Sequence, residues 1–252
     1  MSRPRRPTIA VAGGKGGCGK TTTTLALARA LPGRVLAIDG DRDLPNLHAL
    51  AGVSRERDPT GESRDGTIPI ETRWDVRIAS VPTTSGTERL DSDPRCHLAR
   101  LANRPRETVL IDAPAGASPD AAAPLAVADR TLLVTTLSPP ALCDTVKTAA
   151  MARRLGAPPL GVAVTRASDA PEGTAAVLDV PVLGTVPAVA PPVVSDPRVR
   201  EAYRSVASRI VDVIETPDAI ETTEATGSRT HDARPTSDGR TGRKGRASPI
   251  SN

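Results

Sequence analysis

Short aliphatic runs alternate along the chain with longer stretches in which alanine, leucine and polar residues recur at helical spacing. Such runs are typical of buried strands, and strands that alternate with helices are joined by crossovers into a parallel sheet. Because these crossovers are right-handed, helices cover both faces of the sheet. The pattern predicts a doubly wound α/β fold with a mainly parallel sheet. The expected strands are residues 8–12, 34–39, 76–80, 108–112, 131–135, 161–165 and 182–186.

Two stretches interrupt this alternation and set the expected domain boundaries. Residues 53–74 are charged and contain Gly and Pro, which predicts a surface loop. Residues 216–252 have so few apolar side chains that burial cannot offset the entropy cost of ordering them, and we expect a disordered polar tail. Residues 1–7 form a basic arm. The folded domain is therefore expected to span residues 8–215.

The last predicted helix, at about residues 197–215, carries its apolar side chains on one stripe. A helix of this kind either docks on the sheet or lies on a membrane surface. The stripe is rich in Val and Ala and has no Phe or Trp, which favours docking on the sheet. We therefore expect no direct membrane contact from this helix.

Composition and cysteine spacing limit which cell compartment we expect and which kinds of site the chain can form. The chain has 252 residues, a formal net charge of +4 and only 1% aromatic residues, so its core must consist of Val, Leu, Ile and Ala. The cysteines at 18, 96 and 143 are far apart, which argues against a disulfide framework or an iron–sulfur cluster. We find no signal peptide and no apolar run of the roughly 20 residues that a membrane span needs. These features predict a cytoplasmic protein.

A glycine-rich segment between the first strand and the first helix matches the phosphate-loop pattern G-x-x-x-x-G-K-[ST]. Glycines let the backbone wrap around phosphate with its N–H groups inward, and the helix N-terminus presents further amides to the anion. Lys20 brings a full charge to the β- and γ-phosphates, and the Thr21 hydroxyl is a ligand for Mg²⁺. ATP and Mg²⁺ are the expected ligands. The expected nucleotide-binding residues of this segment are Gly14, Lys15, Gly16, Gly17, Cys18, Gly19, Lys20, Thr21 and Thr22.

Carboxylates stand at the ends of two of the predicted strands. Asp39 ends the second strand, with Asp41 just beyond it, and Asp112 ends the fourth after a run of aliphatic residues. The carboxyl ends of parallel strands meet at one edge of the sheet, where open α/β sheets bind their ligands. We expect these carboxylates beside the phosphate loop. Asp43 is expected to cap a helix at about residues 44–50.

The phosphate loop resembles that of one family in particular. Its sequence KGGCGKTT, from Lys15 onward, is similar to the deviant Walker A motif KGGxGKT[TS] of the MinD/ParA class of P-loop ATPases. In that class the first lysine reaches across a nucleotide-sandwich dimer to the partner's phosphates. The resemblance implies an ATP-dependent homodimer in which Lys15, Lys20 and Asp41 are the catalytic residues.

Two further motifs carry the same resemblance, which covers about residues 8–215. The segment from Asp39 to Asp41 is similar to switch I of the family, where Asp41 would act on the attacking water and Asp39 would support the Mg²⁺ shell. The sequence DAPAG from Asp112 is similar to switch II and to a Walker B carboxylate. The implied metal residues are Thr21, Asp39 and Asp112.

Two later segments match positions at which members of the family surround the adenine base. Thr165 and Arg166 stand at the position of its adenine-side motif, and the segment VLGTVP that ends in Pro187 is similar to the segment that follows its last strand. The resemblance therefore adds Thr165, Arg166 and Pro187 to the nucleotide-binding residues.

The function implied is a slow, partner-stimulated ATPase that switches between monomer and dimer while positioning or partitioning a cargo, such as a division site, DNA or a polar assembly. The activating protein and the cargo stay open. The alternative is an ATP-dependent synthase or ligase, cobyrinate-amidating or dethiobiotin-synthetase-like, on the same fold. An amidating synthase needs a glutaminase domain, for which the chain leaves no room. Intact Lys20, Thr21, Asp41 and Asp112 argue against a binder without turnover.

Arginines near both ends leave a nucleic-acid contact open, because Arg and Lys side chains neutralise backbone phosphates. Acidic residues such as Asp232 and Asp238 dilute the charge of the tail, so this contact is only weakly supported. The candidate residues are Arg3, Arg5, Arg6, Arg240, Arg243, Lys244 and Arg246.

Overall fold

The computed structural model describes residues 6–53, 70–80, 93–116 and 118–216. Residues 1–5 of the predicted arm, 54–69 of the predicted loop and 217–252 of the predicted tail lie outside this described part.

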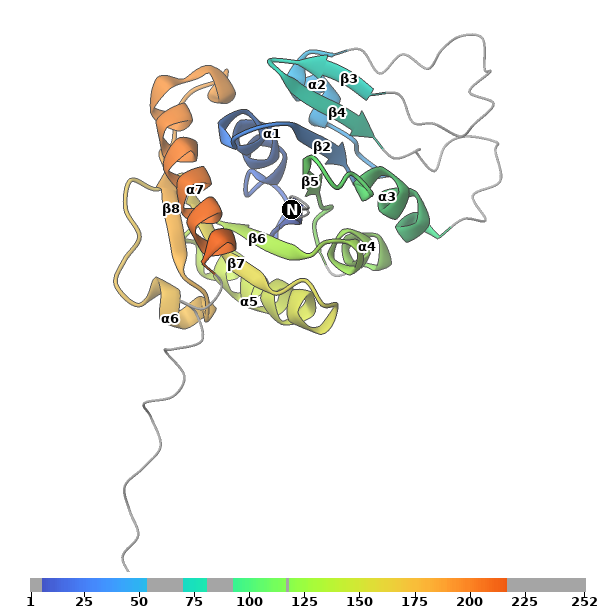
Figure 1. Ribbon diagram of the computed structural model, residues 1–252. Coiled ribbons are helices and arrows are strands. Elements are labelled where there is room, and N and C mark those ends of the chain that lie inside the picture. The colour runs from blue at the N-terminus through green and yellow to red at the C-terminus, as the bar shows by residue number, and fades with distance from the viewer. Residues whose placement is uncertain (1–5, 54–69, 81–92, 117, 217–252) are drawn as a thin grey trace, which may run out of the picture. The chain divides into compact units, whose positions relative to one another are not determined.

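One sheet of eight strands runs through the described residues (Figure 1). Its strands are β1 (Thr8–Ala12), β2 (Val35–Asp39), β3 (Ile70–Arg73), β4 (Val76–Ser80), β5 (Thr108–Asp112), β6 (Arg130–Thr135), β7 (Pro159–Thr165) and β8 (Val182–Val186). The order is β3-β4-β2-β5-β1-β6-β7-β8, and all neighbours are parallel except β3 and β4. β1, β2 and β5 are buried at every position, because each is an aliphatic run in the middle of the sheet. The predicted mainly parallel sheet is confirmed.

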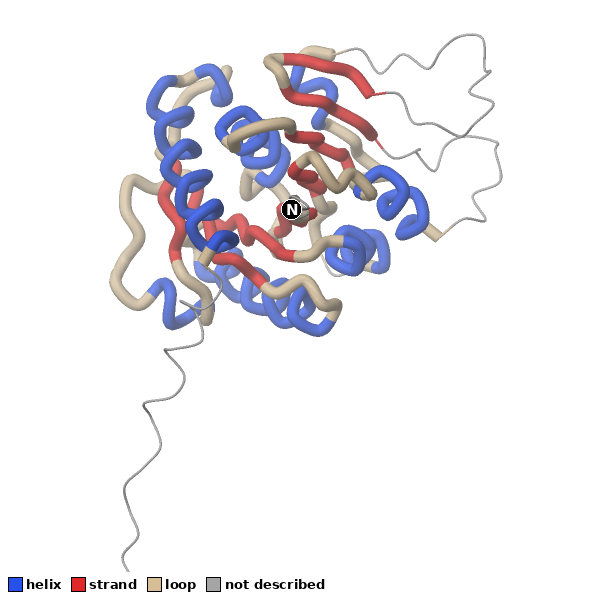
Figure 2. The backbone as a smooth tube through the Cα atoms, in the orientation of Figure 1, coloured by secondary structure: helices blue, strands red, loops and turns tan. Residues whose placement is uncertain are grey.

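Helices cover both faces of this sheet, as Figures 1 and 2 show. They are α1 (Lys20–Ala30), α2 (Leu47–Ala51), α3 (Pro94–Ala102), α4 (Pro119–Val127), α5 (Pro139–Arg154), α6 (Thr174–Leu178) and α7 (Pro197–Glu215), with a 3₁₀ turn, η1, at Val193–Ser195. On one face, Leu25 of α1 and Val206 of α7 belong to one apolar cluster. On the other face, Leu98 of α3, Ala123 of α4 and Ala149 of α5 pack against the strands. The doubly wound arrangement follows from this alternation of faces.

Helix α7 docks on the domain, as its apolar stripe predicts. Val199, Tyr203, Val206 and Ile210 are buried against β8 and α1. The Tyr203 hydroxyl lies 2.7 Å from the Thr23 hydroxyl of α1, and burial raises the pKa of Tyr203 to about 12. The apolar face of α7 is therefore occupied by the domain itself.

The prediction of a surface loop over residues 53–74 is wrong for its last residues. Ile70–Arg73 form β3, an antiparallel edge strand that joins β4 through a two-residue turn. Trp74 and Asp75 of this turn both have positive φ, 51° and 63°, as two-residue hairpin turns of the mirror type require. The Arg29 guanidinium of α1 lies 4.4 Å from the centre of the Trp74 ring. This contact and the half-buried Ile70 hold the hairpin on the domain.

Candidate phosphate site at the carboxyl edge of the sheet

The glycine-rich loop leaves the carboxyl end of β1, between β5 and β6, and enters α1. Gly19 caps α1 with a φ of 97°, a left-handed conformation that glycine adopts without strain. Gly14 has no room for a side chain, because a Cβ there would overlap with Asp144 of α5. The loop is thus fixed by β6 and α5 on one side, while its tip at Lys15, Gly16 and Gly17 is exposed.

The two lysines of this loop lie in opposite environments. Lys20 is only 9% exposed, and its Nζ donates a weak hydrogen bond of 3.5 Å to the carbonyl of Lys15. Its ammonium group therefore points back into the loop, where a bound phosphate would lie. The side chain of Lys15 is exposed at the tip.

The carboxyl groups of Asp39 and Asp112 come together next to the loop. The two residues are partners in the register of β2 and β5, and they are 0% and 2% exposed. The Asp112 carboxyl accepts hydrogen bonds from the hydroxyls of Thr24, at 3.2 Å, and Thr21. Burial raises the pKa of Asp112 to about 7; the Thr21 hydroxyl and the charge of Lys20 lower it, and Asp39 raises it. A cation beside this carboxyl would stabilise its ionised form and lower its pKa again.

Asp39 and Asp41 organise the backbone between β2 and α2. The Asp39 carboxylate accepts hydrogen bonds from the amides of Asp41, at 3.2 Å, and Leu47, at 2.9 Å. The Asp41 carboxylate accepts from the amides of Asp43 and Leu44, at 3.2 and 3.0 Å. The prediction that Asp43 caps a helix at residues 44–50 is wrong. The helix starts at Leu47, whose amide is satisfied by Asp39 from the strand.

Thr165 and Arg166, at the end of β7, contact the phosphate loop itself. The Thr165 hydroxyl lies 2.7 Å from the carbonyl of Cys18 and 3.0 Å from that of Thr135. The Arg166 guanidinium donates to the carbonyl of Gly17 at 2.7 Å. Their predicted place beside the adenine stays a prediction.

The remaining predicted residues are distributed around this edge. Thr22 is half-buried in the first turn of α1. Pro187 is half-buried directly after β8, and the carbonyl of Val186 before it accepts from the amide of Ala167. The ends of β7 and β8 are therefore joined at the same edge as the loop.

One contributor, Thr24, was missed in the sequence. Its hydroxyl lies 3.0 Å from the carbonyl of Lys20 and 3.2 Å from the Asp112 carboxyl. The signal was available, since a residue four positions after Lys20 lies on the same face of a helix.

The donor set suits Mg²⁺ held jointly by protein and nucleotide. Mg²⁺ takes oxygen ligands and usually keeps several waters, with one or two carboxylates and substrate phosphates completing its shell. The Thr21 hydroxyl and the carboxyl groups of Asp39 and Asp112 fit this set. Among the described residues, no group of three or more His, Cys, Asp and Glu side chains could hold a metal ion by itself.

Two surface predictions can be followed only in part. Of the arginines of the predicted nucleic-acid contact, Arg6 alone is described, and its guanidinium donates to the carbonyl of Pro32 at 2.7 Å. No helix within the described ranges is both long enough and apolar enough to cross a membrane.

Comparison with known proteins gives one family. Residues 9–222 match the family model described as the CobQ/CobB/MinD/ParA nucleotide binding domain. An uncharacterized ATP-binding protein of Methanocaldococcus jannaschii is 33% identical over 167 residues, which are 63% of this chain and 64% of the relative. The chain thus spans less than two thirds of that relative's length.

Two solved structures show the same fold. The septum site-determining protein MinD of Pyrococcus horikoshii, complexed with Mg-ADP, aligns with a TM-score of 0.65 and 25% identity over 88% of this chain and 99% of that one. The cell division ATPase MinD of Pyrococcus furiosus aligns with a TM-score of 0.69 and 24% identity over 82% of this chain and 99% of that one.

Proposed function

Since the chain belongs to the CobQ/CobB/MinD/ParA nucleotide-binding domain family, we propose that it is an ATPase of the MinD/ParA type whose dimerisation depends on ATP. The predicted resemblance of the chain to this family is confirmed. The Mg-ADP in the Pyrococcus horikoshii relative supports Mg²⁺ and an adenine nucleotide as the ligands here.

The opposite settings of Lys15 and Lys20 carry this proposal. Lys20 is buried and turned into the loop, so it serves the phosphates bound by its own chain. Lys15 is exposed at the tip, where its ammonium is free to reach a nucleotide held by a second copy. Two triphosphates that face each other repel, and one lysine from each copy reduces that repulsion.

The carboxylates of the edge complete the proposed chemistry. Mg²⁺, when bound, neutralises charge on the phosphate oxygens. Thr21 and Asp112 would hold it, and Asp39 would support its shell from the neighbouring strand. Asp41 is half-buried and already anchored to the turn after β2 by two amides, so it can present its other oxygen to a water beside the γ-phosphate.

The role in the cell follows from this switch. We propose that the ATP-bound dimer engages a cargo or a protein partner during spatial positioning or partitioning, and that hydrolysis releases it. Because the apolar stripe of α7 is covered by β8 and α1, contact through another protein is favoured over direct membrane binding by this helix.

Lys15→Ala tests the proposal most sharply. With a non-hydrolysable ATP analogue and Mg²⁺, light scattering after size exclusion should give the wild type twice the chain mass of 26.1 kDa. Lys15→Ala should bind the analogue yet stay at one chain mass, and its phosphate release from ATP should fall by about a hundredfold. Lys20→Ala should lose binding itself.

Arg154→Ala is the matched control. It removes one exposed positive charge at the last residue of α5, which runs away from the loop toward the opposite edge of the sheet. This variant should dimerise as the wild type does. A normal dimer of Lys15→Ala, or a wild type that stays monomeric with the analogue, would refute the switch.

A further inference from the structure

Two consecutive residues at the end of β7 hold two consecutive carbonyls of the phosphate loop. Arg166 donates to the carbonyl of Gly17 and the Thr165 hydroxyl to that of Cys18, each at 2.7 Å. Thr165 is 6% exposed and also lies 3.0 Å from the carbonyl of Thr135 at the end of β6. Both side chains thus point at the loop backbone from a strand that does not neighbour β1.

These contacts fix the direction of two peptide planes. In a trans peptide the carbonyl and the following N–H point in opposite directions. Because the Gly17 carbonyl points toward Arg166, the N–H of Cys18 in the same peptide points away from Arg166. In the same way, the Cys18 carbonyl points toward Thr165, and the N–H of Gly19 points away from it. Amides that point into the loop are the groups that bind phosphate oxygens.

We propose that Thr165 and Arg166 are positioning residues that aim the amides of Cys18 and Gly19 at the phosphates. They act on the affinity for the phosphate chain and do not read the base. This inference rests on the proposed nucleotide site, but it is independent of dimerisation.

The backbone at Arg166 supports a fixed role for this side chain. Arg166 has a φ of 57°, a left-handed conformation that costs a non-glycine residue free energy and persists where neighbours hold it. The next amide, of Ala167, is bonded to the carbonyl of Val186 on β8, which holds the turn from the other side. Because Arg166 is exposed, burial does not force its contact with Gly17.

Arg166→Asn is the variant that tests the inference. Asn tolerates the left-handed backbone and is too short to reach Gly17, so the guanidinium is lost without added strain. ATP, GTP and inorganic tripolyphosphate, each with Mg²⁺, are measured by displacement of a fluorescent ATP analogue from the full chain. We expect all three affinities to fall by the same factor, about tenfold. Arg166→Lys, which keeps a donor at this place, should recover part of the loss.

Three further variants separate positioning from general destabilisation. Arg153→Ala removes a guanidinium that donates to the carbonyl of Asp179 at 2.6 Å, at the far end of α5, and should leave all three affinities unchanged. Thr165→Val should weaken the three ligands equally, and Thr165→Ser should restore them.

Two results for Arg166→Asn would overturn the inference. A loss for ATP that spares tripolyphosphate would assign Arg166 to the base, and unchanged affinities would assign it no part in the site. If the wild type binds ATP but never dimerises, the switch fails while the positioning role is still tested by these affinities. A wild type that binds no nucleotide refutes both.

Discussion

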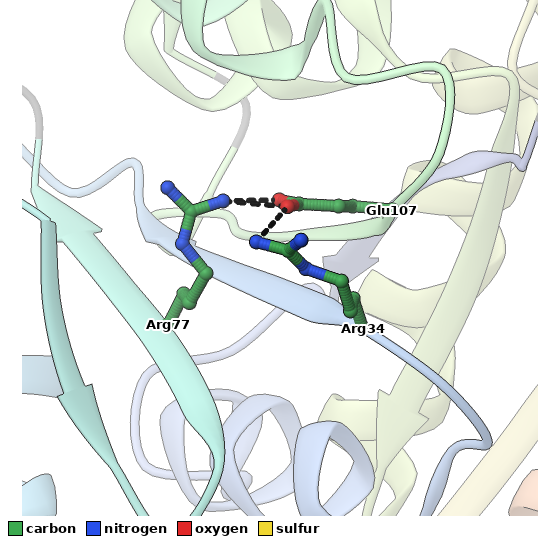
Figure 3. A network of polar contacts seen from close by, with 3 residues as sticks. All are labelled: Arg34, Arg77 and Glu107. Carbon is green, nitrogen blue, oxygen red and sulfur yellow. Dashed lines mark hydrogen bonds and ion pairs between the residues drawn. The ribbon is translucent and has the colours of Figure 1, made fainter.

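Each edge of the sheet holds a buried carboxyl group, but the two groups have different partners. At the amino edge, the Glu107 carboxylate is bound by the guanidinium groups of Arg77, at 2.6 Å, and Arg34, at 3.2 Å (Figure 3). At the carboxyl edge, the Asp112 carboxyl is bound by hydroxyl groups and has a pKa raised to about 7 by its burial. The chain supplies full positive charges to the first carboxyl group and mainly dipoles to the second.

This difference separates a structural ion pair from a ligand site. Glu107 joins β2, β4 and β5 through residues at their amino ends, so its charge is used within the fold. Burial disfavours the ionised form of Asp112, and the charge of Lys20 offsets this effect only in part. A cation that binds together with a nucleotide would stabilise the ionised form. We therefore expect replacement by a neutral amide to destabilise the fold at Glu107 and to stabilise it at Asp112.

Glu107→Gln should have the largest destabilising effect. The amide cannot satisfy two guanidinium groups, and we expect the free energy of unfolding to fall by about 2 kcal/mol, less than for a fully buried pair because Arg34 is 72% exposed. Urea denaturation measures this change. ATP affinity should not change, since the group lies at the edge opposite the loop.

Glu201→Gln is the control for the same chemical change. Its ion pair with Arg204 on α7 is exposed on both sides, 70% and 63%, so the loss should be close to zero. An equal effect of the two substitutions would show that burial of Glu107 has no energetic consequence.

Asp112→Asn should change the stability in the opposite direction, and this change should depend on pH. The folded-state pKa of Asp112 is raised from 3.8 to about 7, so its neutral form is favoured in the fold and the stability it contributes is present below pH 3.8. That contribution is lost as the pH rises from about 4 to 7. Without nucleotide and Mg²⁺, Asp112→Asn should melt several degrees above the wild type at pH 8.

The difference between the two melting temperatures should shrink on going to pH 5. A difference that is the same at pH 5 and pH 8 would contradict the assignment of a raised pKa to this carboxyl. Loss of ATP binding by Asp112→Asn, in contrast, is expected and does not depend on this test.

The fold was predictable where local patterns decide it. The aliphatic runs of β1, β4, β5 and β8 predicted the bounds of these strands correctly. The predicted starts of β2, β6 and β7 differ from the observed ones by one or two residues. β3 was missed because its four residues, IETR, are mostly polar and exposed, so only pairing with β4 makes them a strand. Hairpins at a sheet edge depend on such tertiary pairing more than on composition.

The site was predictable to the extent that it lies in one motif. Lys20 and Asp112 meet at one edge as their positions after strands required. The contacts of Thr165 and Arg166 with the loop were not predicted, because they depend on the order of the strands in the sheet and on the reach of two side chains across the end of β6. The amide at the start of α2 is bound by Asp39 and not by Asp43, which likewise depends on how the chain folds back after β2.

We propose that the carboxyl edge of the sheet is completed by a cation and a triphosphate together. The most direct test is calorimetric titration of the wild-type chain with ATP, once with Mg²⁺ and once with EDTA. We predict tight binding with Mg²⁺ that weakens by about tenfold or more when the metal is removed. Equal affinity under the two conditions, or no binding under either, would contradict it.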